Sequence, residues 1–541
     1  MAMKVPGVYT VEKNAFPNSV VEVATAVPAF IGYTARAEDG AASLTRKPWR
    51  ITSMAEYEHH FGGAPEPVFT IAALPPGTPG TPATQPDMAA ARGQEAVFRL
   101  GSQDYRLTRA AGRAGGRYLM HQGLRHFFQN GGGTCYIVSV GRHGDEIAAG
   151  DAHGGLVGGL VGGLAALLSE QEPTLVVAPD AVLLSRLDCA AVQTALIGHC
   201  GHEMRSRFGI LDVWGGELSR QYANGDCVDA FRADIGNDCL DFAAAYYPWL
   251  HTSVVAADEI DHGVIGNRAE LARLIGLELA LADAAAGDTK AAAVQALLVE
   301  LAGSGGRGGG AWENRLDPAV TLRRRLLDQS LRAVSPLYGR VLDEARVLVN
   351  VMPPSSALAG LYTMVDNTRG VWKAPANISV NGAVAPTVDL SQADQEDLNA
   401  TISGKSVNAI RSFIGEGTLV WGARTLDGNS LDWRYVNVRR TMIMLEESCR
   451  LAVRAMVFEP NVSNTWATVE SMLQNFLTGI WKRGGLAGAV PEDAFSVQVG
   501  LGRTMTPEDI LKGILRVTVL VAIVRPAEFI EITFQQQMPV P

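Results

Sequence analysis

One short stretch of the chain resembles part of a nucleotide-binding site. Residues 403–406 read SGKS, and a glycine, a lysine and a hydroxyl residue in this order end the loop that surrounds phosphate groups in many nucleotide-binding proteins. That loop also needs a glycine five residues before Gly404, and this position is Asn399. No clear strand leads into the stretch, whereas a phosphate loop follows a strand. The sequence therefore disfavours nucleotide binding here.

A second stretch contains residue types that bind metal ions. His199, Cys200, His202 and Glu203 lie within five positions. The pair His202-Glu203 begins like the helical motif of zinc proteases, but the position of the second histidine is Ser206. A single helical turn does not point His199, Cys200 and His202 at one ion. We therefore interpret this stretch as a surface helix without a metal.

Glycine-containing motifs also miss a required feature. Residues 302–306 (AGSGG) lack the first glycine of the serine-hydrolase turn. Residues 131–133 (GGG) precede an apolar strand, whereas a dinucleotide-binding turn follows one. The repeated LVGG at 156–163 favours close packing or a flexible loop. We predict no catalytic, cofactor-binding or metal-ligating residue, no cofactor, and no enzyme activity.

The composition is that of a folded protein with several domains. The chain has 541 residues, 47% of them hydrophobic and 19% charged. Its 46 basic and 56 acidic residues give a net charge of −10, which argues against a general nucleic-acid or anionic-membrane binder. No run reaches the roughly 20 apolar residues of a membrane span, and the start carries no secretory signal pattern. The six cysteines form no C-x-x-C pair, so we expect a cytosolic product with reduced, mostly buried cysteines.

The elements that would position any site are a mixture of strands and helices. Short β-prone runs at 5–12 and 19–23 open the chain, and a β-branched run at 515–524 and an alternating run at 529–535 close it. We expect a buried strand at 515–524 and terminal strands that lack partners. Between them, apolar runs at 135–138, 174–178 and 208–213 alternate with helical stretches at 164–168 and 190–197, which is α/β patterning.

Two segments read as additions to this core. Residues 64–86 are rich in proline and lack periodicity, so we expect an irregular surface excursion outside the core. Residues 255–345 read as a self-contained helical insertion: Asn267 and Glu270 form a capping box, Asp288 starts a helix, and 303–310 is a glycine linker. The predicted apolar face of the second helix contains Val294, Leu297, Leu298 and Leu301.

Two amphipathic helices are predicted in the C-terminal region. The first begins near Arg439 and places Met442, Leu445, Cys449, Ala452 and Met456 on one side, with Glu446, Arg450 and Arg454 on the other. The second follows Asn464, buries Trp466, Val469, Leu473, Phe476 and Ile480, and ends at Lys482-Arg483-Gly484. Cations and a glycine suit the negative end of a helix.

Longer segments carry a family resemblance. Residues 408–413 (NAIRSF), 419–426 (LVWGARTL) and 433–440 (WRYVNVRR) resemble the C-terminal half of contractile phage tail sheath proteins. Further similar segments, in the expected order, are 6–9 (PGVY), 25–33 (TAVPAFIGY), 130–133 (NGGG), 246–249 (YYPW), 368–377 (TRGVWKAPAN) and 525–529 (RPAEF). The chain is therefore identified as a member of the contractile tail sheath family, which includes the sheaths of contractile injection systems.

The resemblance implies a multidomain α+β and α/β fold. It divides the chain into an N-terminal linking arm at 1–25, a middle or outer α/β domain at 26–350 with insertions at about 40–115 and 255–345, an inner α+β sheath domain at 351–524, and a C-terminal linking arm at 525–541. The implied function is a structural subunit that polymerises as a helical tube around an inner tail tube and contracts to drive that tube through a target envelope. Which particle carries it stays open among phage tails, R-type bacteriocins and injection systems.

The implied partners are other copies of the chain, the inner tube protein, and baseplate and terminal cap proteins, without nucleic acid or membrane insertion. The particle would be made in the bacterial cytoplasm and released or membrane-anchored. The residues that we expect to form inter-subunit strands are Val8, Tyr9, Val11, Val21, Val23, Phe529, Ile530, Ile532 and Phe534. Residues 402–483 contain ten basic and seven acidic residues, a net +3 against −13 elsewhere. We therefore expect some of the candidates Arg450, Arg454, Lys482 and Arg483 to face an acidic tube exterior.

Two alternatives remain beside the sheath hypothesis. One is a nucleotide- or metal-binding enzyme domain, which rests only on residues 403–406 and the cluster around His199. The other is a module that binds a surface and is displayed on a particle by the outer insertion.

Overall fold

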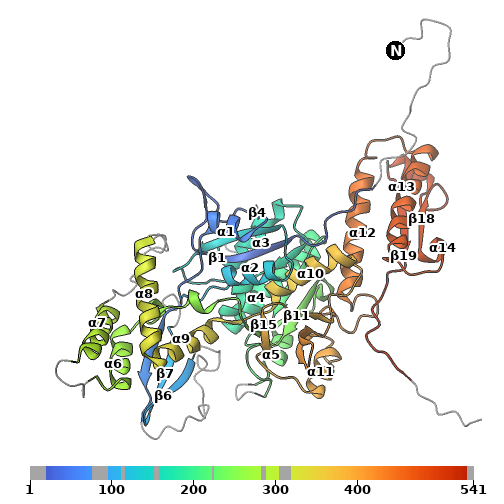
Figure 1. Cartoon of the computed structure of the whole chain (residues 1–541). Helices are drawn as coiled ribbons and strands as arrows, with labels where there is room; N and C mark the ends of the chain where they lie inside the picture. Colours follow the sequence, from blue (N-terminus) through green and yellow to red (C-terminus); the bar gives the residue numbers. More distant parts are fainter. Residues whose placement is uncertain are drawn as a thin grey trace, which may run out of the picture. The chain divides into compact units, whose positions relative to one another are not determined.

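The computed structural model describes residues 20–75, 95–110, 116–150, 158–221, 225–281, 288–303 and 318–532. These residues form two compact units (Figure 1). Unit 1 contains 20–25, 369–373 and 437–532, and unit 2 contains the described residues of 26–368 and 374–436. The predicted inner domain, 351–524, is thus divided between the units, because residues 374–436 cluster with the preceding α/β region.

A nine-stranded mixed sheet forms the centre of unit 2. Its strand order is β14 (Ile378–Ser379), β17 (Gly417–Val420), β16 (Asn408–Phe413), β11 (Ala243–Tyr247), β10 (Phe208–Asp212), β9 (Leu175–Val177), β1 (Pro28–Thr34), β8 (Cys135–Arg142) and β4 (Trp49–Ile51). The six strands from β16 to β8 run parallel, and the outer strands pair antiparallel. This confirms the predicted strands at 135–138, 174–178 and 208–213.

Helices cover both faces of this sheet. They are α1 (Met54–Phe61), α2 (Met120–Gln129), α3 (Gly159–Ala166), α4 (Arg186–Gly198), α5 (Cys227–Asp234), α10 (Ser355–Arg369) and α11 (Gln392–Asn399). Successive residues of β1 point to opposite faces: the Phe30 ring packs edge-on against Phe127 of α2, with centroids 5.1 Å apart. Ile31 instead faces α3, where a Cβ on Gly163 would lie 2.3 Å from its Cγ2 atom. The predicted glycine repeat therefore permits close packing.

Short elements complete unit 2. Single-turn helices are η3 (Leu167–Ser169), η4 (Pro179–Leu183), η6 (Leu240–Phe242), η7 (Ala257–Glu259) and η8 (His262–Val264), and η5 (His199–Met204) is a π-helical turn. A second sheet pairs β12 (Leu250–Thr252) with β13 (Val351–Met352) and β15 (Ala383–Pro386), and β2 (Glu38–Asp39) pairs with β3 (Ala42–Ser43).

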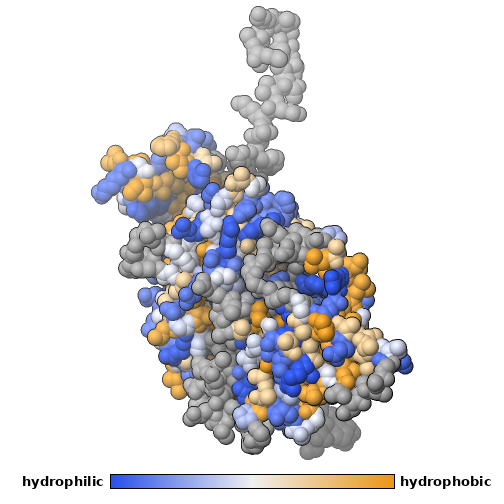
Figure 2. All heavy atoms as spheres, turned by 90° about the vertical axis from the view of Figure 1, so that its left-hand side faces the viewer, coloured by the Kyte–Doolittle hydropathy of each residue, from blue (hydrophilic) through white to orange (hydrophobic). Residues whose placement is uncertain are grey.

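The two predicted additions share one hydrophobic core. Strands β5 (Phe69–Ala73), β7 (Gln103–Arg109) and β6 (Glu95–Leu100) form a sheet. Helices α6 (Arg268–Glu278), α7 (Thr289–Gly303), α8 (Pro318–Val334) and α9 (Pro336–Val349) pack in the same apolar cluster. Phe69 and Ile71 are buried there with Leu271 and Leu274. Apolar and hydrophilic residues are interspersed on the face of the molecule that carries α6, α7 and α8 (Figure 2).

This shared core corrects three predictions. Within the surface excursion predicted at 64–86, strand β5 buries Phe69 and Ile71 in this core, whereas its other three residues are exposed. The helical insertion is not self-contained, because removal of α6 and α7 would expose the sheet beneath them. The first addition is also narrower than 40–115, because β4 and α1 belong to the main domain.

The two predicted helix starts in the insertion have different outcomes. Asn267 precedes α6 but does not cap it; its side chain bonds the backbone N–H and C=O of Ile71 in β5, at 2.9 and 2.7 Å. The Asn267 side chain therefore bonds the backbone of β5, and the predicted capping box does not form. Asp288 does accept hydrogen bonds from the Lys290 and Ala291 amides. The predicted face of α7 is confirmed by buried Leu298 and Leu301, with Val294 and Leu297 half-buried.

Unit 1 has its own core. It contains α12 (Val436–Arg454), α13 (Ser463–Lys482), α14 (Pro491–Ala494), α15 (Pro507–Leu511) and the antiparallel ribbon β18 (Phe495–Val499) with β19 (Val517–Val521). Val469, Leu473 and Ile480 of α13 are fully buried, as predicted, whereas Trp466 and Phe476 are half-buried. Both predicted helices are confirmed, but Met456 lies beyond the end of α12. Among the described helices of the chain, none is long and apolar enough to cross a membrane.

The terminal runs differ from their predicted strands. The run at 515–524 forms β19, but its residues are half-buried or exposed because only one face packs. Residues 20–25 and 524–532 form no strand within the single chain. The predicted strand at 5–12 and residues 533–535 lie outside the described residues.

Candidate functional site

The stretch that resembles a phosphate loop has a structural role. Lys405 is buried, and its Nζ atom donates to the carbonyl oxygens of Arg232 and Ile235 at 2.7 and 2.5 Å. Ser406 Oγ donates to the Asn399 carbonyl at 2.7 Å. Burial lowers the pKa of Lys405. The lysine that would bind phosphate therefore holds this loop against the end of α5 (Cys227–Asp234), and the serine hydroxyl holds it against the end of α11 (Gln392–Asn399).

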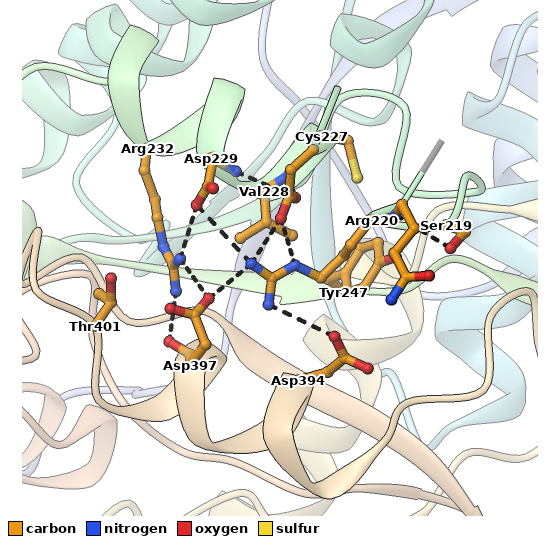
Figure 3. Close-up of polar contacts among 12 residues, drawn as sticks. Ser219, Arg220, Cys227, Val228, Asp229, Arg232, Tyr247, Asp394, Asp397 and Thr401 are labelled. Carbon is orange, nitrogen blue, oxygen red and sulfur yellow. Dashed lines mark hydrogen bonds and ion pairs between the residues drawn. The ribbon is translucent and has the colours of Figure 1, made fainter. Parts of the chain in front are cut away.

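An ion-pair network beside Lys405 was not predicted from the sequence (Figure 3). Arg220 contacts Asp226 at 2.6 Å and Asp397 at 2.7 Å, and Arg232 contacts Asp397 at 2.8 Å. Although burial by itself raises the pKa of Asp397, its hydrogen bonds and its attraction to Arg232 and Arg220 together lower it. The network joins α5 to α11, which are 165 residues apart at Arg232 and Asp397. No local pattern signals a pairing over that distance.

The side chains of the cluster around His199 contact one another, an arginine and a cysteine. His199 is buried; its Nδ1 atom lies 3.0 Å from Glu203 Oε2, and its Nε2 atom accepts from Arg207 at 2.7 Å. Burial and the Arg207 charge lower the pKa of His199 to about 4. His202 Nε2 lies 3.4 Å from the sulfur of Cys239 instead. The predicted cluster therefore separates into two contacts, and no group of three ligating side chains occurs among the described residues.

Two buried carboxylates lie at the carboxyl edge of the parallel sheet, where α/β proteins bind ligands. Asp180 accepts the backbone N–H groups of Tyr33 and Leu119 at 2.8 and 2.6 Å. Asp212, at the end of β10, accepts the backbone N–H and the hydroxyl of Ser355 at 2.8 and 2.5 Å. Burial raises the pKa of Asp180 to about 6 and that of Asp212 to about 7. Asp180 therefore joins β1 to the start of α2, and Asp212 accepts hydrogen bonds from the first residue of α10, where it caps the helix.

The glycine motifs and the cysteines also fit structural roles. Gly131 has a φ of 88° in the turn between α2 and β8, so this glycine stretch is a connecting loop. Residues 304–306 lie outside the described part of the chain. The six cysteines are free thiols, and four of them are buried.

The predicted arm residues include an exposed apolar stretch at the C-terminal end. Phe529, Ile530 and Ile532 are exposed and lie outside any strand. At the other end Val21 is exposed, whereas the backbone N–H of Val23 donates to Ser448 Oγ at 3.2 Å. Val8, Tyr9, Val11 and Phe534 lie outside the described residues.

The four predicted tube-facing residues all lie in unit 1 and are exposed. Arg450 forms a double hydrogen bond with Glu447, at 2.8 and 2.5 Å. Arg483 pairs with Glu22 at 2.5 Å, and its guanidinium lies 5.2 Å from the centre of the Trp372 ring. Arg450 and Arg454 lie near the C-terminal end of α12, and Lys482 and Arg483 lie at that of α13.

Comparison with protein families places a sheath domain at the end of the chain. The sequence model of the phage tail sheath C-terminal domain matches residues 429–537. This range contains α12, α13 and the β18–β19 ribbon of unit 1.

Curated tail sheath proteins are similar over part of the chain. The tail sheath protein of Vibrio phage KVP40 is 26% identical over 138 residues, which are 25% of this chain and 20% of that protein. The tail sheath protein of Burkholderia phage BcepMu is 28% identical over 148 residues, which are 26% of this chain and 31% of that protein. The aligned parts thus span less than a third of these relatives.

Two solved contractile assemblies are similar over almost the whole chain. One is the PVC sheath complex of an extracellular contractile injection system in the contracted state. Its sheath chain is 25% identical to this chain, with a TM-score of 0.56, and the alignment covers 99% of each chain. The helical sheath of the anti-feeding prophage in the contracted state has 26% identity and a TM-score of 0.56, with 99% of this chain and 100% of that chain covered. These relatives are structural sheath proteins, not enzymes. The C-terminal part of the chain therefore matches the phage tail sheath C-terminal domain, and almost the whole chain is similar to structural subunits of contractile sheaths.

Proposed function

We propose that the chain polymerises into a helical sheath around an inner tube and contracts to drive that tube through a target envelope. The observation that carries this proposal is the similarity, over 99% of the chain, to subunits of two contracted sheaths. The protein is part of a phage tail or a tail-like injection particle. Its synthesis in the bacterial cytoplasm and its contacts with tube, baseplate and cap proteins belong to the proposal.

The terminal arms would connect the subunits. In the described part of the chain β18 and β19 pair only with each other in their sheet, so each has an edge with open backbone groups. A strand from another copy can add to such an edge through directional hydrogen bonds. A head-to-tail contact of this kind that does not close produces a helical filament. Contraction would then be a rigid-body rearrangement of subunits whose arms stay joined, without nucleotide consumption.

The inner and outer roles follow from this arrangement. Unit 1 would form the lattice and lie against the tube. The α/β domain and the subdomain formed by β5–β7 and α6–α9 would face outward. Negative-stain microscopy of the purified assembly tests the proposed function: we expect hollow tubes, and monomers alone would contradict it.

The tube-facing residues give a testable prediction. Replacing Arg450, Arg454, Lys482 and Arg483 with glutamate should impair assembly on the tube and leave the subunit folded. A sheath must hold its tube and later release it, and many weak, water-screened charge contacts repeated around a ring suit this better than a dry apolar seam. Each exposed ion pair contributes only about 0 to 1 kcal/mol to folding, so the circular dichroism spectrum should not change.

A matched control separates the local effect from total charge. Replacing Arg142, Arg186, Arg273 and Arg323 of unit 2 with glutamate changes the net charge equally, and these arginines also form exposed ion pairs. Co-sedimentation with the tube over a range of salt concentrations should detect a loss only for the unit 1 variant. Equal salt tolerance of both variants and the unaltered protein would contradict the predicted tube contact.

A further inference from the structure

A fully exposed phenylalanine lies in the loop between α12 and α13. Phe458 has no burial within the chain, and its φ angle is 72°, in the left-handed region. The backbone N–H of Glu459 donates to the Met456 carbonyl at 3.1 Å, so Phe458 is the third residue of a tight turn. Glycine is favoured at a turn position with positive φ, and a bulky residue there is an outlier.

The loop is held in place by its neighbours. Asn461 Nδ2 donates to the Ile514 carbonyl at 3.1 Å, and the Trp466 indole N–H donates to Asn461 Oδ1 at 2.6 Å. Ile514 lies three residues before the ribbon strand β19, and Trp466 lies in the first turn of α13. The loop that contains Phe458 is therefore hydrogen-bonded, through Asn461, to the segment before β19 and to α13.

Phe458 combines two unfavourable features, a strained backbone and an exposed ring, and no contact among the described residues covers the ring. Left-handed backbone in a residue other than glycine costs on the order of 1 kcal/mol or more, and an exposed aromatic ring keeps a large apolar area in water. The adjacent Val457 and the nearby Val462 are exposed as well. Strained conformations persist where a function uses them, and an apolar patch of this kind is typical of a protein interaction site.

We infer that Phe458, with Val457 and Val462, is an apolar anchor that inserts into a second copy of this chain in the assembled sheath. The inference rests on the proposed function. A second copy is the occupant because Asn461 of this loop is hydrogen-bonded to Ile514, three residues before β19, and the open edges of the β18–β19 ribbon are the proposed site of an incoming strand. An apolar anchor also suits contacts between subunits that stay joined, since permanent interfaces are more apolar than transient ones. The tube contact, by contrast, must be released.

Two substitutions of Phe458 test the anchor in the full-length chain. Phe458→Gly removes the ring and relieves the backbone strain, so the dissociated subunit should melt at an equal or higher temperature while its assembly falls by on the order of tenfold or more, as for an interface hot spot. Phe458→Asp should lose assembly more completely. The control is Leu511→Asp, because Leu511 is also exposed in unit 1, on α15. It should assemble like the unaltered protein.

Sedimentation and negative-stain microscopy, each with and without the inner tube, give distinct outcomes. Normal assembly of Phe458→Gly would overturn the anchor, and so would an equal loss in Leu511→Asp. If a Phe458 variant forms normal polymers without the tube but does not assemble around the tube, Phe458 contacts the tube instead, and the inference is overturned. If the unaltered chain forms no tubes, the proposed function itself fails, and this result is visible before any variant is compared.

Discussion

Deleting residues 528–541 is expected to yield a soluble, folded protein that forms no long tubes. The described part of this segment exposes Phe529, Ile530 and Ile532 and forms no strand in the single chain. Its removal therefore costs the isolated subunit little, but it removes the strand that we propose for a neighbour's ribbon. Circular dichroism should retain the native spectrum, and microscopy should show no sheaths.

The N-terminal deletion should end at residue 19. Residues 20–25 contact the rest of unit 1 at three places. Glu22 pairs with Arg483, and the backbone N–H of Val23 donates to Ser448 Oγ. Arg440 donates to the Thr25 carbonyl at 2.9 Å. Deleting 1–19 spares these contacts, and we expect the same loss of tubes. A suitable control is Glu531→Gln, which keeps the alternating apolar residues and should assemble. Intact sheaths from either deletion would contradict strand exchange.

Replacing Arg207 with alanine is expected to produce the largest loss of folding stability. The Arg207 side chain is completely buried. It donates to the carbonyl oxygens of Pro173, Leu167 and Glu170 at 3.1, 3.0 and 2.5 Å, and to His199 Nε2 at 2.7 Å. Removing it takes the Arg207 donors from the Pro173 and Glu170 carbonyls and from His199 Nε2, whereas the Leu167 carbonyl keeps the Glu170 N–H as a donor. Each unsatisfied group in the interior costs about 1–3 kcal/mol. We expect a loss of about 3 kcal/mol or more, because three buried acceptors lose this donor.

Urea denaturation followed by fluorescence measures this loss. Arg207→Lys should recover little of it, because an ammonium group is a point charge and does not reach acceptors arranged around a planar guanidinium. Arg186→Ala is the control: its pair with Asp234 is partly exposed, at 3.4 Å, and should contribute about 1 kcal/mol or less. A change below 1 kcal/mol for Arg207→Ala would show that the interior relaxes around the missing side chain.

Local patterns predicted the elements that depend on neighbours in sequence. The stripes of α12 and α13 repeat every three to four residues, and the strands β8, β9 and β10 are apolar runs of a length typical of buried parallel strands. Cap and turn signals such as Asp288 also depend on adjacent residues. These elements are confirmed, as is the α/β character of unit 2.

The amino-acid sequence by itself determined the resemblance to tail sheath proteins, the α/β pattern and the missing residues of each catalytic motif, because each of these depends on contiguous residues. Only the tertiary structure decided which distant segments meet. It showed that β5 packs with α6, that Asn267 bonds the sheet rather than capping its helix, and that Arg232 and Asp397 pair across 165 residues. Apolar periodicity shows that a face is buried but does not identify its partner, and a charged side chain can pair with any opposite charge that folding brings near. Phe458 illustrates the same limit, since neither its left-handed φ nor its exposure can be read from the residue type.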